Sequence, residues 1–342
     1  MVKRIIAILF LSCLFLFSKG QDIHYSQFYM APSIINPSLN GLFDADYRFT
    51  LNHRTQWRSI TVPYQTNSGN FELGLFKNNT FFSSGAISFN NDKAGDSELG
   101  FNSLGLSFAL HFYASKNNNQ TISLAFNSNF TQRKFNVENL TFDNQFNGDA
   151  FDKKIPINEY FNNTKYAFVN MALGANYQYF DKDINYINFG FAVYNFNTPN
   201  QSFFNNTSVN LSQRYVFYTN NIFSLNYKYG IVPSLIYQIQ DKYQEFVIGG
   251  LFQYNINRAS KRDKTFQRLY FGPFYRFNDA IILAVKYDYK DYRIGISYDI
   301  NVSKLRIASK SRGAFEISFM YLIRTPNKNK YDKKYQVCPT WM

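Results

Sequence analysis

The sequence predicts an all-β fold, a transmembrane antiparallel β-barrel of about 14 strands. Three observations carry this prediction: long stretches of alternating apolar and polar residues, a leader typical of exported proteins, and a composition rich in aromatic residues. Of the 342 residues, 20% are aromatic and 17% are charged, yet the mean hydropathy is only −0.33. A helical membrane protein would be more hydrophobic overall, whereas a barrel places its apolar residues at alternate positions.

The first 20 residues are expected to be a cleaved signal peptide, because Lys3 and Arg4 precede an apolar run over 5–17. This run is shorter than the roughly 20 residues that a membrane helix needs. No other stretch competes with it, so the mature protein is expected to have no transmembrane helix. Cleavage after Gly20 would also remove one of the two cysteines and leave Cys338 without an intrachain partner.

The opening strand, predicted over 45–58, has the clearest alternation in the chain. Its length of about 14 residues exceeds the average soluble strand of roughly 5 or 6 and reaches the roughly 9–11 needed to cross a bilayer at a tilt. The apolar side is expected to face lipid and the polar side to face the lumen. The lipid side consists of Tyr47, Phe49, Leu51, His53 and Trp57, and the lumen side of Arg48, Thr50, Asn52, Arg54, Gln56 and Arg58.

The same alternation predicts the remaining strands of the barrel. With the opening strand they make fourteen, an even number that returns both termini to one side of the membrane. They are expected at 64–76, 83–91, 100–114, 119–135, 164–180, 184–197, 213–223, 230–240, 245–256, 267–277, 279–289, 291–301 and 312–324.

Loop lengths predict the orientation of the barrel, since outer-membrane barrels have short periplasmic turns and long external loops. We therefore expect both termini to be periplasmic. A basic turn at 257–266 is the exception to the short periplasmic turns. The other periplasmic turns are 77–79, 115–119, 181–183 and 290–291, and the long external segments are 136–163, 198–212 and 302–311.

Two segments are predicted to lie outside the barrel domain of 46–324. Residues 21–45 have no lasting alternation and are interpreted either as a periplasmic lead or as a plug in the lumen. Residues 325–342 form a basic tail that is either a periplasmic docking element or a disordered terminus. The possible docking residues in this tail are Cys338, Pro339 and Trp341.

Charged residues on the inner side of the strands predict an ion-paired lumen, because a buried charge is costly unless it is paired. The same residues are also interpreted as the selectivity lining of a pore. They are Arg48, Arg54, Arg58, Glu72, Arg293, Asp299 and Glu316.

No catalytic constellation is recognisable, and neither His-x-x-x-His nor Cys-x-x-Cys spacing occurs. The sequence therefore predicts no enzyme, no cofactor and no metal site. The formal net charge of +13 is spread through turns and tail without any nucleic-acid-binding motif. It is better explained by the lumen lining, by anionic lipid or by an acidic protein partner than by nucleic acid.

Several motifs, in this order, resemble the PorP/SprF family of outer-membrane proteins of the type IX secretion system in Bacteroidota. The resemblance spans essentially the whole mature chain and includes the motif residues Asn36, Pro37 and Gly41. The motifs are Gln21-Asp22-Ile23-His24-Tyr25-Ser26-Gln27-Phe28-Tyr29, Asn36-Pro37-Ser38-Leu39-Asn40-Gly41, Arg54-Thr55-Gln56-Trp57, Tyr292-Arg293-Ile294-Gly295-Ile296-Ser297-Tyr298-Asp299, Gly313-Ala314-Phe315-Glu316-Ile317-Ser318 and Cys338-Pro339.

The resemblance implies a fourteen-stranded barrel that is linked to gliding motility or to adhesins at the cell surface. Its implied partners are an exported substrate or adhesin with a C-terminal sorting domain, and periplasmic or lipoprotein components of the apparatus. We expect the loop 136–163 to bind the exported partner through Phe142, Phe146, Phe151 and Tyr160, which are apolar anchors among polar residues. The alternative function is that of an outer-membrane pore or a transporter of hydrophobic substrates.

Overall fold

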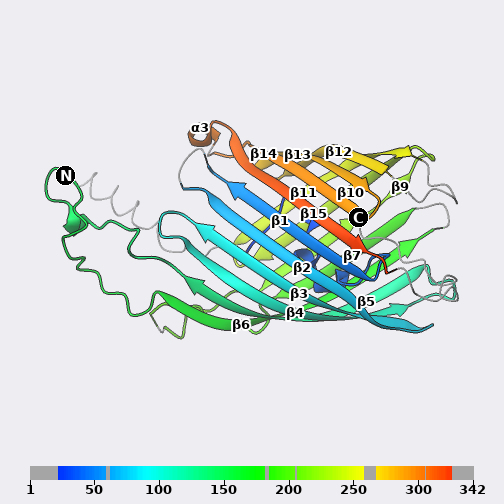
Figure 1. Cartoon of the computed structure of the whole chain (residues 1–342), viewed down its shortest axis with the longest axis horizontal. Coiled ribbons are helices and arrows are strands. Elements are labelled where there is room, and N and C mark those ends of the chain that lie inside the picture. Colours follow the sequence, from blue (N-terminus) through cyan, green and yellow to red (C-terminus); the bar gives the residue numbers. More distant parts are fainter. Residues whose placement is uncertain are drawn as a thin grey trace.

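The chain forms a closed antiparallel β-barrel whose strands run obliquely around a central lumen (Figure 1). The computed structural model describes residues 22–58, 62–181, 185–204, 206–257, 267–304 and 306–325. Strands that follow one another in sequence pair with one another, and β15 pairs with β1 to close the barrel. The predicted fold class and the count of fourteen strands are confirmed, since β8 and β9 are two parts of one strand that both pair with β10.

Most strands begin and end within three residues of their predicted bounds. They are β1 (Tyr47–Gln56), β2 (Tyr64–Lys77), β3 (Phe81–Ala94), β4 (Leu99–Tyr113), β5 (Gln120–Lys134), β6 (Lys165–Phe180), β7 (Tyr186–Tyr194), β8 (Arg214–Asn220), β9 (Phe223–Ser224), β10 (Tyr229–Gln240), β11 (Tyr243–Asn257), β12 (Gln267–Arg276), β13 (Ala280–Tyr289), β14 (Tyr292–Asn301) and β15 (Arg312–Ile323).

Four strands differ from the prediction in length or continuity. β3 has 14 residues where 9 were expected, and β7 has 9 where 14 were expected. The opening strand has 10 residues instead of about 14 and ends at Gln56, because Trp57 takes a left-handed backbone conformation with φ 58° that cannot continue a strand. The strand predicted over 213–223 is interrupted between β8 and β9. Ile222 within this interruption keeps a bridge to Tyr186, so the barrel wall stays joined there.

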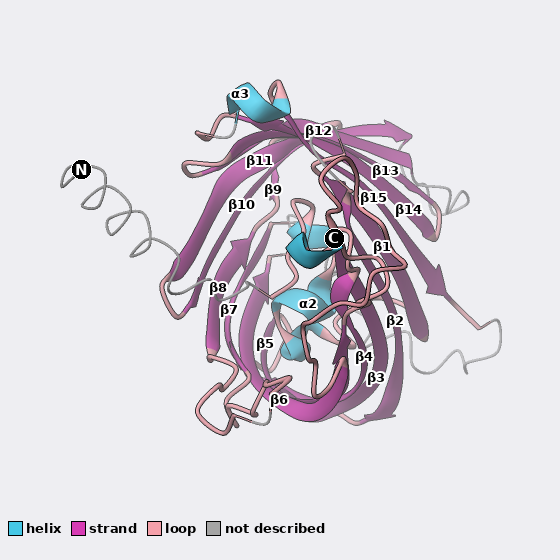
Figure 2. Cartoon of the chain, turned by 90° about the vertical axis from the view of Figure 1, so that its left-hand side faces the viewer, coloured by secondary structure: helices cyan, strands magenta, loops and turns pink. Residues whose placement is uncertain are grey.

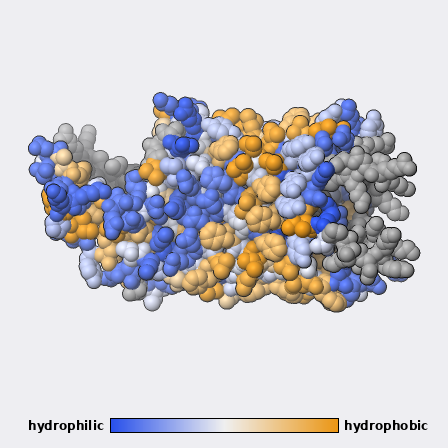
Figure 3. Space-filling view, viewed as in Figure 1, coloured by the Kyte–Doolittle hydropathy of each residue, from blue (hydrophilic) through white to orange (hydrophobic). Residues whose placement is uncertain are grey.

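The strands present apolar side chains outward and polar side chains inward. On β15, Phe315 and Ile317 are 44% and 42% exposed, whereas Glu316 and Ser318 between and beyond them are buried. Figure 3 shows the apolar residues gathered over the strands and hydrophilic residues gathered at the end drawn on the left. This is the residue distribution of a barrel that stands in a membrane.

The two ends of the barrel differ in the length of their connections. The loops 135–164, 195–213 and 302–311 lie together at one end, which we call the long-loop end, and contain η4 (Asp143–Gln145) and α3 (Arg306–Ser309). The other end, called the short-turn end, carries connections such as 78–80 and 290–291. No helix in the described part of the chain is long and apolar enough to cross a membrane.

The lumen is occupied by residues 22–45, which we call the lumen segment. It contains η2 (Phe28–Met30), α2 (Pro32–Ile35) and η3 (Pro37–Leu39), and Figure 2 shows these helices inside the ring of strands. Most of its apolar residues are almost fully buried: the rings of Phe28 and Tyr29 pack against that of Phe274 at centroid distances of 5.9 and 5.7 Å.

The lumen segment runs from one end of the barrel to the other. Asp22 contacts Gln240 and Arg214 at the long-loop end, whereas Asp46 contacts Ile323 at the short-turn end. The prediction placed both termini on one side. The first and last strands do begin and end on one side, but the first described residue lies at the opposite end because the chain crosses the lumen before β1.

We predict that Ile317→Arg destabilises the barrel, because it places a charge on the outward face of the closing strand. The cost is expected to be roughly 2–4 kcal/mol near the middle of the bilayer. The loss of heat-modifiable migration in gel electrophoresis would measure it, with Ile317→Leu as the control. Normal folding of the arginine variant would mean that this face does not contact lipid.

Candidate functional site

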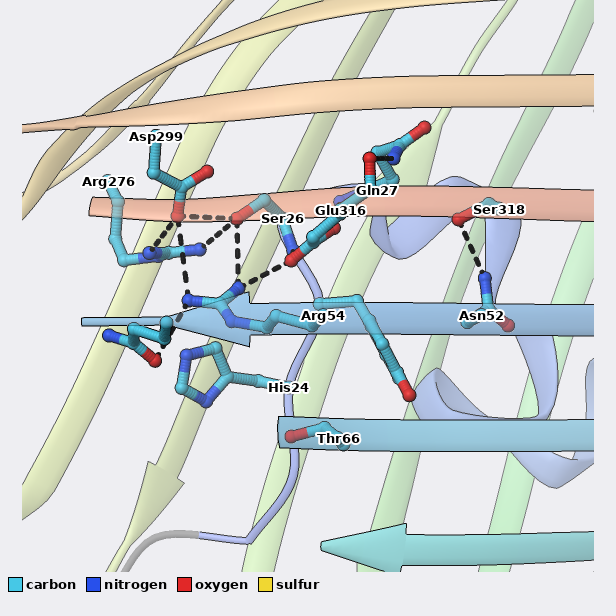
Figure 4. Close-up of polar contacts among 12 residues, drawn as sticks. His24, Ser26, Gln27, Asn52, Arg54, Thr66, Arg276, Asp299, Glu316 and Ser318 are labelled. Atoms are coloured by element: carbon cyan, nitrogen blue, oxygen red, sulfur yellow. Dashed lines mark hydrogen bonds and ion pairs between the residues drawn. The ribbon is translucent and has the colours of Figure 1, made fainter. Parts of the chain in front are cut away.

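The Glu316 carboxylate on the barrel wall fixes the first turn of the lumen segment. It accepts backbone N–H groups from Ser26 at 2.6 Å and from Gln27 at 2.9 Å (Figure 4). Arg54 on β1 donates to the same carboxylate at 2.5 Å. Because Arg54 and Glu316 are opposite residues of the β1–β15 pair, this ion pair also spans the strand pair that closes the barrel.

A second ion pair binds the Ser26 hydroxyl beside the first. Ser26 Oγ donates to Asp299 at 2.8 Å and accepts from Arg276 at 2.6 Å. Arg276 and Asp299 are themselves 3.0 Å apart, and Arg276 also lies 3.6 Å from the carboxylate of Glu245. The Ser26 hydroxyl therefore contacts two cations, Arg54 and Arg276, and one carboxylate, Asp299, and all four side chains are at least nine-tenths buried.

A third ion pair fixes the last turn of the lumen segment near the short-turn end. Arg48 donates to both oxygens of Glu72, at 2.7 and 2.6 Å, and to the carbonyl of Leu39 at 3.1 Å. The Glu72 carboxylate in turn accepts the N–H of Gly41 at 2.9 Å. Gly41 has φ 83°, and a Cβ there would lie 2.3 Å from Ser84 Cβ, so only glycine fits this turn.

The Asn-Pro motif holds the lumen segment against β6 and β7. Asn36 donates to the carbonyls of Ala175 at 2.9 Å and Phe191 at 3.1 Å, and its side-chain oxygen accepts from the N–H of Ser38. A Cβ on Gly174 would lie 2.0 Å from Asn36 Oδ1, so wall and segment are in close contact here. The motif residues Asn36, Pro37 and Gly41 are thus contact points between segment and barrel.

The sequence-predicted charged residues divide into separate groups. Arg54, Glu316 and Asp299 come together, and Arg48 pairs with Glu72. Arg58 is exposed beyond the end of β1 and outside these groups, because the strand ends before it. Arg293 is buried next to Met320, away from Arg54.

Sequence reasoning missed Arg276 and Glu245, which complete the cluster around Ser26. The available signal was alternation: Arg276 shares the inward side of β12 with the buried Tyr270 and Phe274. It also missed Lys286, whose fully buried ammonium lies 4.1 Å from the ring centre of Tyr270 and 3.3 Å from Asp288.

The aromatic residues predicted to bind a partner lie in the loop 135–164. Phe146 and Phe151 pack together with ring centres 5.3 Å apart and are 48% and 53% exposed, and Tyr160 is 83% exposed. Phe142 instead packs on Phe161. Cys338, Pro339 and Trp341, like the predicted signal peptide and most of the basic turn 257–266, lie outside the described residues.

The loop 135–164 is joined to the loop 195–213 by an aromatic cluster. Phe203 from the second loop packs edge-on against Phe135 at 4.8 Å and against Tyr166 at 4.6 Å between ring centres. Phe161 joins the same cluster through Phe135. The two longest loops therefore contact each other at the long-loop end.

A closed barrel with apolar residues outside and a polar, occupied lumen defines a membrane β-barrel of the kind found in bacterial outer membranes. The chain belongs to the PorP/SprF family, described as type IX secretion system membrane protein, whose profile matches residues 17–321. The resemblance drawn from the sequence is thereby confirmed. No curated protein matches the sequence significantly.

Similar folds occur among solved barrels. The toluene transporter TbuX of Ralstonia pickettii is 10% identical, with 86% of this chain and 94% of that chain covered and a TM-score of 0.48. A FadL homologue of Pseudomonas aeruginosa is 9% identical, with 85% and 94% covered and a TM-score of 0.45. These likenesses concern the barrel fold alone.

We predict that Glu316→Gln loosens the lumen segment, because it removes the nearer of the two carboxylates that pair with Arg54 and weakens the contact with two backbone N–H groups. Removing one partner of a buried ion pair typically costs about 3–5 kcal/mol. We expect more frequent current steps in planar bilayers than for the unaltered protein. Glu138→Gln in the exposed loop is the control, and a Glu316 variant as silent as the control would contradict this role of the carboxylate.

Proposed function

We propose that this protein is an outer-membrane component of type IX secretion and gliding motility that binds an exported surface protein, such as an adhesin, through its long loops. Its C-terminal tail contacts periplasmic or lipoprotein components of the apparatus. The exported partner is engaged through its C-terminal sorting domain. The barrel stands in the outer membrane with the long-loop end outside and the tail in the periplasm.

The observation that carries this proposal is the occupied lumen. The lumen segment is held by buried ion pairs at both ends and by the Asn36 contacts between them. A lumen filled in this way supports binding at the barrel mouth over passage through the barrel. The alternative of a pore or hydrophobic-substrate transporter requires the segment to move, against several buried charge pairs.

The composition of the loop 135–164 supports partner binding at the long-loop end. The exposed aromatic rings of Phe146, Phe151 and Tyr160 stand among asparagine, aspartate and lysine residues. Aromatic anchors within a polar rim are the usual composition of a protein interface. The cluster around Phe203 joins the loop that carries these rings to the loop 195–213.

We predict that replacing Phe146, Phe151 and Tyr160 together with serine abolishes recovery of the exported partner. The rings would supply most of the buried contact area, and each hot-spot aromatic typically contributes about 2 kcal/mol or more. Affinity purification from native membranes in mild detergent, followed by mass spectrometry, measures the recovery.

The matched control replaces Lys153 and Lys154 of the same loop with serine and should leave recovery unchanged. Truncation after Asn327 should keep the exported partner and lose the periplasmic components, which separates the two contacts. Full recovery of the exported partner by the aromatic variant would place its binding site elsewhere on the protein.

We also predict the orientation of the barrel by cysteine labelling in a Cys338→Ser background. On intact cells a polyethylene-glycol maleimide too large for porins should label Tyr160→Cys, which lies in an exposed loop. Thr80→Cys, exposed in a connection at the short-turn end, should be labelled only after lysis. The reverse pattern would mean that the long loops face the periplasm.

A further inference from the structure

A cleft lies between the lumen segment and the inner face of β3–β6 at the long-loop end. It encloses about 70 Å³ and is bordered on one side by Asp22, Ile23 and Ile34 of the lumen segment. The wall opposite is lined by uncharged amide and hydroxyl groups, most of them buried. These wall residues are Ser88, Asn90, Ser103, Asn127, Asn129, Thr131 and Asn170.

The polar groups of this wall form a connected array. Asn129 donates to Asn127 at 2.6 Å, and Asn127 donates to the hydroxyl of Ser107 at 2.7 Å. A second row runs from Thr131 through Asn170 to Asn195, with each contact at 2.9 Å. Side chains fixed in this way present donors and acceptors at set positions, which is the arrangement of a preformed polar binding surface.

Three buried atoms at the cleft have no hydrogen-bond partner. The side-chain oxygen of Asn90, a residue 8% exposed, lacks a donor, and the Nε–H groups of Arg133 and Arg214 lack an acceptor. Leaving such groups unsatisfied is unfavourable, and more so for a charged group. A ligand that supplies a hydroxyl to Asn90 and a carboxylate to Arg133 satisfies two of them at once.

The charges at the cleft favour a ligand that carries one acidic group. Arg214 is already engaged with Asp22 at 3.7 Å and with the carbonyl of Ile23 at 3.1 Å, and it lies over the ring of Tyr194. Arg133 forms no ion pair within 4 Å in the described part of the chain, so it is the lining cation whose charge a ligand carboxylate can still pair with. Asn90 on β3 is level with Thr131 on β5, so Arg133 lies two strand spacings across and two residues along the strand, roughly 12 Å from Asn90 between backbones. The long arginine side chain shortens this distance.

The aromatic lining and the volume of the cleft restrict the class of ligand further. Phe101 and Phe168 lie beside the amide array, a combination of aromatic and amide groups that suits a ring with apolar faces and polar edges. At roughly 10–15 Å³ of cavity per water, the space holds about five to seven waters. This is room for one small ring with its substituents and too little for a folded peptide turn.

We propose that this cleft binds a single acidic monosaccharide unit of a glycan, with its carboxylate at Arg133, a hydroxyl at Asn90 and its ring beside Phe101 and Phe168. The site is distinct from the exposed aromatic rings of the loop 135–164. It does not depend on the proposed function, because it uses the inner wall of the barrel and a different class of ligand.

The test uses saturation-transfer NMR on the full-length protein in detergent, with D-glucuronate, D-glucose and acetate as probes. Glucuronate should receive saturation, glucose should bind roughly tenfold more weakly, and acetate should not compete at equal concentration. Arg133→Gln and Asn90→Leu should each weaken glucuronate by roughly tenfold. Heat-modifiable migration shows whether each variant is folded.

The control is Lys134→Gln, which removes a neighbouring exposed cation of β5 and should leave glucuronate binding unchanged. Equal binding of acetate and glucuronate would reduce the cleft to a site for an adventitious anion and overturn the proposal. So would unchanged glucuronate binding in both folded cleft variants, or an absence of saturation transfer to glucuronate in the unaltered protein.

Discussion

The position of the lumen segment depends on the carboxylate of Glu316. A carboxylate buried inside a barrel is stable only where other groups replace its water, and here Arg54 and two backbone N–H groups do so. Because Glu316 and Arg54 face each other across β1 and β15, closing the barrel assembles the binding site for the segment. Closure of the wall and filling of the lumen are therefore coupled through the same side chains.

The charges select the position of the lumen segment, and apolar burial supplies the larger part of its stability. Phe28, Tyr29 and Met30 are at most 2% exposed and pack against wall residues such as Phe274. Burying a large apolar side chain contributes roughly 1.5–3 kcal/mol. A buried ion pair contributes little beyond its own desolvation cost but strongly disfavours any register in which one partner is left alone.

Alternation was sufficient to predict the strands because each strand separates lipid from a polar interior. The pairing of Arg48 with Glu72 also follows from the register of two adjacent strands. The path of residues 22–45 through the lumen could not be predicted from the sequence, because short helical turns without a repeated pattern do not indicate which surface they pack against. Arg276 was missed for a related reason: its role depends on Ser26, which is 250 residues away in sequence and reaches it only inside the closed barrel.

At the long-loop end, the lumen segment contacts parts of the chain that are distant from it in sequence. Asp22 accepts a hydrogen bond from Asn195, the first residue after β7, which itself contacts the wall through Asn170. The loop that begins at Asn195 reaches the aromatic cluster through Phe203. A ligand or protein that displaces these loops therefore changes the contacts of Asp22, so occupancy at the mouth is physically linked to the hold on the lumen segment.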